Sequence, residues 1–281
     1  MKFIEKFVAF VDVLGFKGFV EDCEIGTGMP LAELLGVLAG LGVGNEREKY
    51  DKYGPICCPK SRYVQRNLDF RLTQISDCVI VSTEISPAGV INLIHHCSTA
   101  VLMLLQKGIM CRGYINRGKI YHTDTQVIGS GYHLAYHNEK GVSFFKNQPN
   151  ERGTPFVEVD PEVSKYVEHS QDRCIKEMYS RFVKSDGEHA ALFPFNALSH
   201  SFLGSEFNAE EEHREIQKAR EWLSTLRKRV LANVDVANTD ALQKAQHYLR
   251  AIDAQVLACD EAEEFIDGLT MPVTGRRVDQ F

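Results

Sequence analysis

The sequence predicts an α+β fold, with strands and helices interleaved in the first part of the chain and helices dominating its end. Two observations support this class. Short apolar runs rich in Val, Ile and Phe, which are typical of strands, alternate with longer segments whose apolar residues recur at helical spacing. Beyond about residue 160, helical spacing predominates. We therefore expect a mixed core over residues 1–160 and a mainly helical extension over residues 161–281, packed on the core or on a partner subunit.

The first predicted element is an apolar strand within Phe7 to Phe16. At Gly15 the chain is expected to turn and begin a helix. A second apolar strand follows in the segment 74–82. Residues 90–107 predict a mostly buried helix that ends at Gly108. Together with the segments that follow up to residue 139, the predicted order is strand, helix, strand, strand, helix, strand, strand and helix.

The alternating pattern returns after that helix. Residues 109–121 alternate strongly, and the glycines in each half indicate a tight turn between two paired strands. Residues 127–139 predict a short strand that runs into a helix, and residues 156–159 predict a final strand.

The C-terminal part predicts an antiparallel helical hairpin. Residues 210–234 and 239–265 carry apolar side chains at helical spacing, and the segment between them indicates a turn and a new N-cap. A stripe of this kind is typical of core packing rather than of a cofactor site.

Two acidic residues lie in or beside apolar strand runs. Asp12 is in the middle of its run, where no basic residue neutralises it, and Asp77 stands just before the β-branched stretch that follows Cys78. An isolated charge in a dry site is costly, so it is paired, hydrogen-bonded, protonated or bound to a metal. Two carboxylates on adjacent strands predict a divalent ion that binds nucleotide phosphates. The alternative is that Asp12 caps the next helix and Asp77 belongs to a hairpin turn.

Small residues after Asp12 favour a phosphate contact. Gly15 and Gly18 would let backbone N–H groups approach an anion at a helix N-terminus. The segment is not a Walker loop, because no Gly-Lys-Ser/Thr sequence follows. We expect Leu14, Gly15 and Phe16 to contact the substrate.

Composition narrows the function classes. The 281 residues carry a net charge of -6, which argues against broad electrostatic binding to nucleic acid. We find no segment apolar enough to span a membrane and no signal peptide, and we expect a cytoplasmic protein. Adjacent Cys57 and Cys58 lack companions at zinc-site spacing. The scattered cysteines predict reduced core thiols; these are Cys23, Cys78, Cys97, Cys111, Cys174 and Cys259.

Three segments resemble motifs of the class III nucleotidyl cyclase catalytic domain, over roughly residues 3–140. Phe10-Val11-Asp12-Val13-Leu14-Gly15-Phe16 is similar to that family's first metal motif, and Ser76-Asp77-Cys78 is similar to its second. Residues 114–118 resemble the strand-turn segment beyond the central helix. Residues 127–139 resemble the helix that brings polar residues to the partner subunit's site.

The resemblance implies a catalytic core with a ferredoxin-like βαββαβ arrangement and a head-to-tail homodimer with sites at the interface. It implies two divalent ions per site, Mn²⁺ or Mg²⁺, held by Asp12 and Asp77, with the backbone carbonyl of Val13 as a further ligand. The two acids would be the catalytic residues.

The departures from the family pattern concern base recognition. Ser130 stands where purine cyclases carry an Asp that reads adenine, and His133 and His137 replace a transition-state Asn and Arg. Together with the helical extension, this is similar to the pyrimidine cyclases of bacterial Pycsar anti-phage systems. That similarity implies conversion of UTP to cyclic UMP, which acts on a separate effector. The alternatives are a cytidylate cyclase, a purine cyclase, or a non-catalytic module that binds nucleotide or dimerises.

Further substrate contacts are expected from four polar residues. Tyr50 and Arg71 belong to a segment of mixed basic residues and tyrosines, which in this family often lies near the nucleobase. Its alternative is a solvated connection. Asn116 and Arg117 are placed for a phosphate or ribose contact, although an Asn in a β-turn before Gly118 is the commoner explanation.

Overall fold

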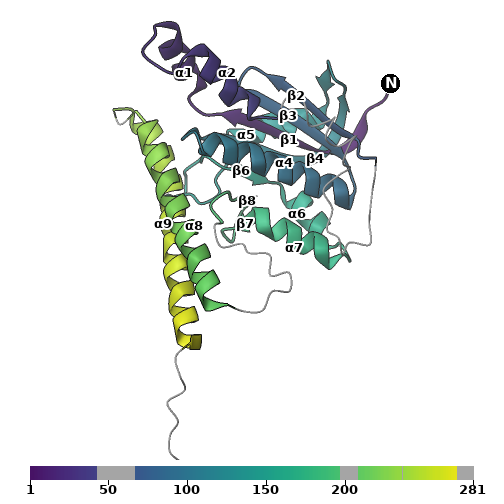
Figure 1. The fold of residues 1–281 in the computed structure, drawn as a ribbon. Coiled ribbons are helices and arrows are strands. Elements are labelled where there is room, and N and C mark those ends of the chain that lie inside the picture. Colours follow the sequence, from purple (N-terminus) through teal and green to yellow (C-terminus); the bar gives the residue numbers. More distant parts are fainter. Residues whose placement is uncertain (43–66, 197–207, 236, 271–281) are drawn as a thin grey trace, which may run out of the picture.

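The computed structural model describes residues 1–42, 67–196, 208–235 and 237–270, which form a mixed α+β structure (Figure 1). The strands are β1 Ile4–Val13, β2 Phe70–Ile75, β3 Cys78–Glu84, β4 Cys111–His122, β5 Val127–Ile128, β6 Val157–Val159, β7 Val183–Ser185 and β8 Ala190–Leu192. The helices are α1 Phe16–Glu24, α2 Leu31–Ala39, α4 Pro87–Leu105, α5 Ser130–Glu139, α6 Pro161–Glu168, α7 Arg173–Phe182, α8 Ala209–Ala232 and α9 Thr239–Thr270.

The first four strands confirm the predicted ferredoxin-like core. They lie in the order β2-β3-β1-β4, and each neighbouring pair is antiparallel. Helices α1 and α2 connect β1 to β2, and α4 connects β3 to β4, which gives the βαββαβ order. The strand that carries Asp12 is therefore at the centre of this core.

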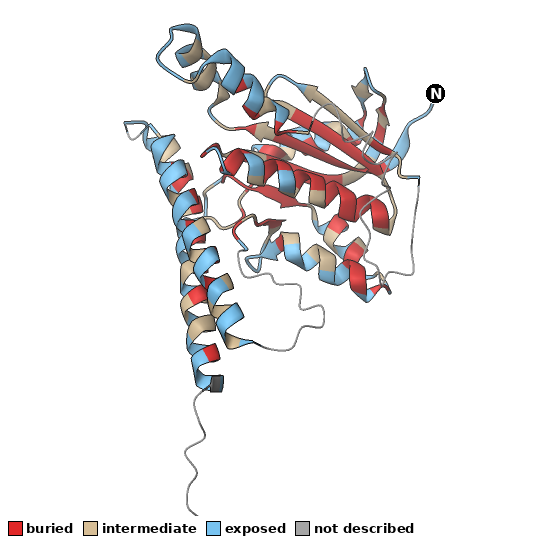
Figure 2. Cartoon of the chain, in the orientation of Figure 1, coloured by how far each residue is buried: buried red, intermediate tan, exposed pale blue. Residues whose placement is uncertain are grey.

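The sheet is covered by different helices on its two faces. Phe7, Ala9 and Val11 of β1 belong to the main apolar cluster together with side chains of α4. Val8 and Phe10 point to the other face, where Ala135 of α5 packs on them. Figure 2 shows the buried residues concentrated in the central strands and in α4.

Helix α4 contradicts the expectation that no segment of the chain is apolar enough to span a membrane. It is long and apolar enough to do so, but 72% of its most apolar stretch is buried inside the fold. Its apolar character is accounted for by its place as the core helix under β1 and β3.

The expected turn within residues 109–121 is wrong, because β4 is one continuous strand of 12 residues. Its glycines serve close packing instead. A Cβ on Gly113 would lie 2.4 Å from the Phe10 carbonyl oxygen, and one on Gly118 would lie 2.6 Å from the Cα of Gly131 in α5. These glycines therefore let neighbouring backbones approach.

The sheet continues beyond the strand that was expected to be its last. β6 pairs with β4 in parallel, and β8 and β7 extend the sheet past it. The sheet therefore crosses residue 160, and the purely helical part begins at α8.

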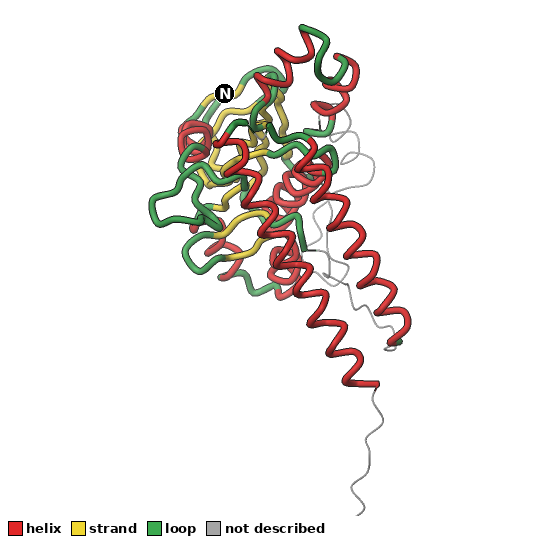
Figure 3. The backbone as a smooth tube through the Cα atoms, turned by 90° about the vertical axis from the view of Figure 1, so that its left-hand side faces the viewer, coloured by secondary structure: helices red, strands yellow, loops and turns green. Residues whose placement is uncertain are grey.

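The predicted C-terminal helical hairpin is confirmed. Helices α8 and α9 lie side by side (Figure 3), and Asn238 caps α9 by accepting bonds from the N–H groups of Asp240 and Ala241. Leu223 and Tyr248 of the hairpin share an apolar cluster with aromatic residues of the core.

One expectation about the cysteines is wrong. Cys23, Cys78, Cys97, Cys111 and Cys259 are free, whereas Cys174 is disulfide-bonded. Isolation of a cysteine along the sequence does not imply isolation in space.

Candidate metal and nucleotide site

The structure brings the two predicted acids to one end of the sheet core. Asp12 is the penultimate residue of β1, on the face covered by α5, and Asp77 lies in the two-residue turn between β2 and β3. The N–H of Val13 donates to the carbonyl oxygen of Asp77 at 3.1 Å, which fastens the turn to the end of β1. Val13, the predicted carbonyl ligand, thus belongs to the same junction.

Asp77 belongs to a turn rather than to a strand, as the alternative interpretation had it. The preceding residue, Ser76, has a φ of 54°, the left-handed conformation that two-residue hairpin turns require. The turn does not remove Asp77 from the candidate site, because the hairpin register places Cys78 directly opposite Asp12.

Neither carboxylate is compensated by the protein. Both side chains are partly buried, and across the described residues neither Asp12 nor Asp77 makes an ion pair or a side-chain hydrogen bond. Burial, followed by the charges of Asp77 and Glu139, raises the pKa of Asp12 to about 7, against the opposing effects of Arg112 and Lys140. A bound cation would offset the repulsion between the two carboxylates and stabilise the ionised form of Asp12.

The donor set fits a hard divalent ion. Carboxylate and carbonyl oxygens are the ligands that Mg²⁺ and Mn²⁺ prefer. In the part of the chain that the structure describes, no group of three or more His, Cys, Asp or Glu side chains could hold a metal. The side-chain ligands of this chain would therefore be the two acids, and backbone carbonyls, water or phosphate oxygens would complete the coordination.

The expected phosphate-facing turn follows directly after Asp12. Gly15 has a φ of 74°, which a residue with a Cβ adopts only at a cost, and α1 begins at Phe16 without a side-chain cap. The Leu14 N–H donates to the Met110 carbonyl oxygen at 2.9 Å, so the turn is held to the start of β4. The three predicted contact residues therefore lie beside the two acids.

Charged residues on β4 and at the end of α5 complete the surroundings of Asp12, and the sequence analysis missed them. Arg112 stands directly opposite Asp12 in the β1–β4 register and forms an ion pair with Glu139 at 2.5 Å. Lys140 follows, with its Nζ 5.5 Å from the ring centroid of Tyr136. No sequence signal joins these residues, because strand register and the packing of α5 bring them together.

Arg71 and Asn116 lie farther along the sheet. Both are in register with the Ser82–Val8 pair, four residues from Asp12, or about 13 Å along the strand. Arg71 pairs with two acids, Asp69 and Asp124. Asn116 is buried and donates to the Gly131 carbonyl oxygen at 3.1 Å, so it joins β4 to α5. Within one chain these two residues are not assembled with the acids.

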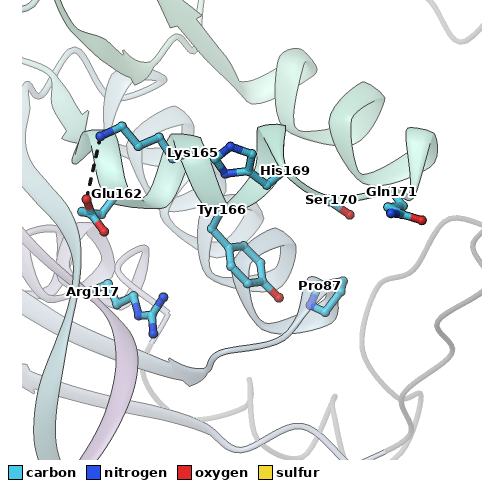
Figure 4. Close-up of a pocket in the computed structure, with 8 residues that line it drawn as sticks. All are labelled: Pro87, Arg117, Glu162, Lys165, Tyr166, His169, Ser170 and Gln171. Carbon is cyan, nitrogen blue, oxygen red and sulfur yellow. Dashed lines mark ion pairs between the residues drawn. The ribbon is translucent and has the colours of Figure 1, made fainter.

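Arg117 lies opposite Phe7, so strand alternation directs its side chain to the face of the sheet away from Asp12. Its Nε and Nη2 donate to the carboxylate of Glu5 at 3.1 Å each. It lines a cavity of about 460 Å³ together with Tyr166 and Lys165 of α6 (Figure 4). Arg117 is therefore part of a different surface of the molecule.

The remaining candidates lie on α5 or outside the described residues. Ser130, His133 and His137 are exposed on α5, so their side chains are available to another molecule. Tyr50 lies outside the described residues.

Comparisons with known proteins identify no family for this chain. No protein-family model matches, and no curated protein matches. Among solved structures, the catalytic core of a rhodopsin-guanylyl cyclase with converted specificity, in complex with ATPαS, matches with a TM-score of 0.39 and 10% identity. That match covers 60% of this chain and 83% of the other chain. Similarity at this level assigns neither a family nor a function.

Proposed function

We propose that this chain is a metal-dependent nucleotidyl cyclase that converts UTP to 3′,5′-cyclic UMP and pyrophosphate. One observation carries the proposal: Asp12 near the end of the central strand and Asp77 in the β2–β3 turn held to that end are neighbouring carboxylates, and neither forms an ion pair within the described residues. Such a pair is suited to a divalent ion whose open positions bind a triphosphate. The motifs around both acids, which resemble those of class III cyclases, supply the reaction type.

In the proposed reaction the ribose 3′-oxygen attacks the α-phosphorus, its proton is lost to solvent, and the bond to the pyrophosphate oxygen breaks. Asp12, Asp77 and the Val13 carbonyl would hold the cations. When bound, these cations would favour ionisation of the 3′-hydroxyl and offset the charge of the triphosphate. The backbone N–H groups at the start of α1 would orient a phosphate, because the Gly15 turn leaves them without a side-chain cap.

The proposal includes a homodimer in which α5 of one subunit contributes to the site of the other. The exposure of Ser130, His133 and His137 on α5 supports this arrangement, since exposed side chains are available to the site of another subunit. Uracil recognition and a role in anti-phage signalling through a separate effector rest on the resemblance to pyrimidine cyclases. The proposed cytoplasmic location rests on the sequence pattern, in which no signal peptide was found.

The test is to incubate the purified protein with Mn²⁺ and each of the four ribonucleoside triphosphates, and to identify products by chromatography and mass spectrometry. Cyclic UMP as the principal product is expected. Cyclic CMP or a cyclic purine nucleotide would overturn the substrate assignment, and no product from any triphosphate would favour a non-catalytic module.

Variants connect the activity to the two acids. Asp12→Asn and Asp77→Asn should each lower the rate by at least about 100-fold, because each removes a carboxylate that the metal-dependent reaction needs. Asp253→Asn is the matched control, since this exposed acid pairs with Arg227 on the C-terminal hairpin. Undiminished activity in either site variant would contradict the proposal.

A further inference from the structure

We propose that Glu139 is a positioning residue of the metal site, because it holds the Arg112 guanidinium and thereby keeps Asp12 open to a divalent cation. This inference rests on the proposed function and adds to it a residue that does not itself bind the metal. Three features carry it: the strand register, the geometry of the ion pair, and the burial of Glu139.

The register makes Asp12 the expected partner of Arg112. The two residues are directly opposite on antiparallel β1 and β4. Side chains at such positions point to the same face with Cβ atoms about 5 Å apart, and opposite charges there attract. An Asp12–Arg112 ion pair would occupy the carboxylate that the metal needs. No such pair forms between these two described residues.

Arg112 forms its ion pair with Glu139 instead. The Nε and Nη2 of Arg112 both lie 2.5 Å from Oε1 of Glu139, and Nη1 donates to the Gly153 carbonyl oxygen at 3.4 Å. A Cβ on Gly153 would lie 2.7 Å from Nη1, so the glycine leaves room for the guanidinium. The arginine is thus bound on the side of α5 and of the segment after it.

Burial makes this arrangement firm. The side chain of Glu139 is only 2% exposed and that of Arg112 is 14% exposed. Separating the pair would leave a carboxylate uncompensated inside the protein, which is strongly unfavourable. Without the Glu139 charge, Arg112 would keep its positive charge, and the carboxylate directly opposite it is Asp12. The freed arginine would then compete with a cation.

The test measures Mn²⁺ affinity directly, by isothermal titration calorimetry without nucleotide. Glu139→Gln should weaken binding by about tenfold or more, the usual effect of removing an outer-shell partner. The double variant Glu139→Gln/Arg112→Met should restore affinity to within about threefold of the unmodified protein, because the competing charge is gone. Glu188→Gln is the control. Glu188 is exposed on the β7–β8 connection and forms an ion pair with Lys146, so its replacement should leave the Mn²⁺ affinity unchanged.

The outcomes separate this inference from the proposed function. Rescue by the double variant supports the positioning role, since structural damage would persist or worsen when a second buried residue is replaced. If the protein binds Mn²⁺ and Glu139→Gln binds it equally well, the inference fails and the metal site stands. Equal weakening in the single and double variants, with circular dichroism showing both folded, also overturns it. Absence of Mn²⁺ binding by the unmodified protein would overturn the metal site itself and the inference with it.

Discussion

At the scale of single residues, the Asp12 carboxylate destabilises the metal-free fold when it is ionised. Its pKa rises from 3.8 to about 7, mainly through burial and then through the charge of Asp77. The folded state therefore holds this proton more tightly than the unfolded state does. Stability contributed by the protonated form is present below pH 4 and is lost as the pH rises through about 7.

Asp12→Asn should therefore stabilise the metal-free protein at pH 8. We expect a gain of about 1–2 kcal/mol, a value reduced for solvent screening because the carboxyl is partly exposed. The gain should shrink towards zero at pH 4, and urea unfolding in EDTA at both pH values measures it. A gain that does not depend on pH would contradict the electrostatic explanation.

Divalent ions should reverse the order of stability. At a Mn²⁺ concentration of about 100 times its Kd, binding to the folded state alone adds about 2.7 kcal/mol. We expect thermal unfolding of the unmodified protein to shift upward with Mn²⁺ and to return when EDTA is added. Asp12→Asn and Asp77→Asn should lose this response. An equal shift in Asp12→Asn would place the bound ion elsewhere.

At the scale of secondary-structure elements, His122 links three strands of the core. Its Nδ1 lies 2.8 Å from the Ser82 hydroxyl and its Nε2 lies 3.0 Å from the Thr73 hydroxyl, which joins β4 to β3 and β2. Burial, followed by the charges of Lys6 and Arg71, lowers its pKa from 6.5 to about 4. Protonation therefore favours the unfolded chain, and stability is lost as the pH falls from 6.5 towards 4.

The variant His122→Gln should remove this acid sensitivity. Between pH 6.5 and 4, protonation of His122 should lower the free energy of unfolding of the unmodified protein by up to about 3 kcal/mol, and this decrease should be absent in the variant. Asp12 acts in the opposite direction between pH 4 and 7, so the comparison is best made in the Asp12→Asn background by urea unfolding. An unchanged slope with pH after substitution of His122 would contradict the assignment.

The junction between α4 and the C-terminal hairpin depends on Gly108. This residue has a φ of 76°, and a Cβ there would lie 2.2 Å from the Arg229 carbonyl oxygen of α8. Gly108→Ala should lower the free energy of unfolding by about 1–3 kcal/mol, because the residue would be strained and the hairpin displaced. Gly36→Ala in α2 is the control: apart from its own helix backbone, no atom of the described residues lies within 4 Å of the added Cβ, and a gain of up to about 1 kcal/mol is expected. Equal effects in urea unfolding would contradict the packing argument.

Elements with a long or strongly apolar pattern could be predicted from the sequence. The central strand, the core helix and the C-terminal hairpin are of this kind. The error in β4 arose because glycines that allow close backbone packing have the same sequence pattern as turn glycines. β7 and β8 have only three residues each, too few for alternation to be recognised.

The residues of the candidate site likewise fall into those that could be predicted from the sequence and those that could not. Asp12 and Asp77 could be found because a charge beside an apolar run is unusual whatever the tertiary structure. The Arg112–Glu139 pair could not, since its members are 27 residues apart and meet only through strand register and helix packing. Likewise, Arg117 was expected near the substrate, but strand alternation directs it to the opposite face of the sheet.

At the scale of the whole molecule, the proposed dimer makes each site dependent on two chains. Asp12→Asn and the double variant His133→Ala/His137→Ala should each be inactive as homodimers. In an equal mixture of exchanging subunits, half of the dimers are mixed and each has one intact site, so about a quarter of the activity should return. Activity assays after co-expression measure this. Lack of recovery despite demonstrated mixed dimers would contradict the composite site.

The contact between Gly118 and Gly131 has a consequence for protein engineering. Because neither residue carries a side chain, these two glycines set the smallest possible gap between α5 and the sheet. Glu139 is fixed at the far end of the same helix. Replacing Gly131 with a larger residue would tilt α5 or move it away from the sheet, and would thereby change the geometry of the ion pair between Glu139 and Arg112. Ion affinity could thus be retuned from the opposite end of a helix, with every candidate ligand left in place.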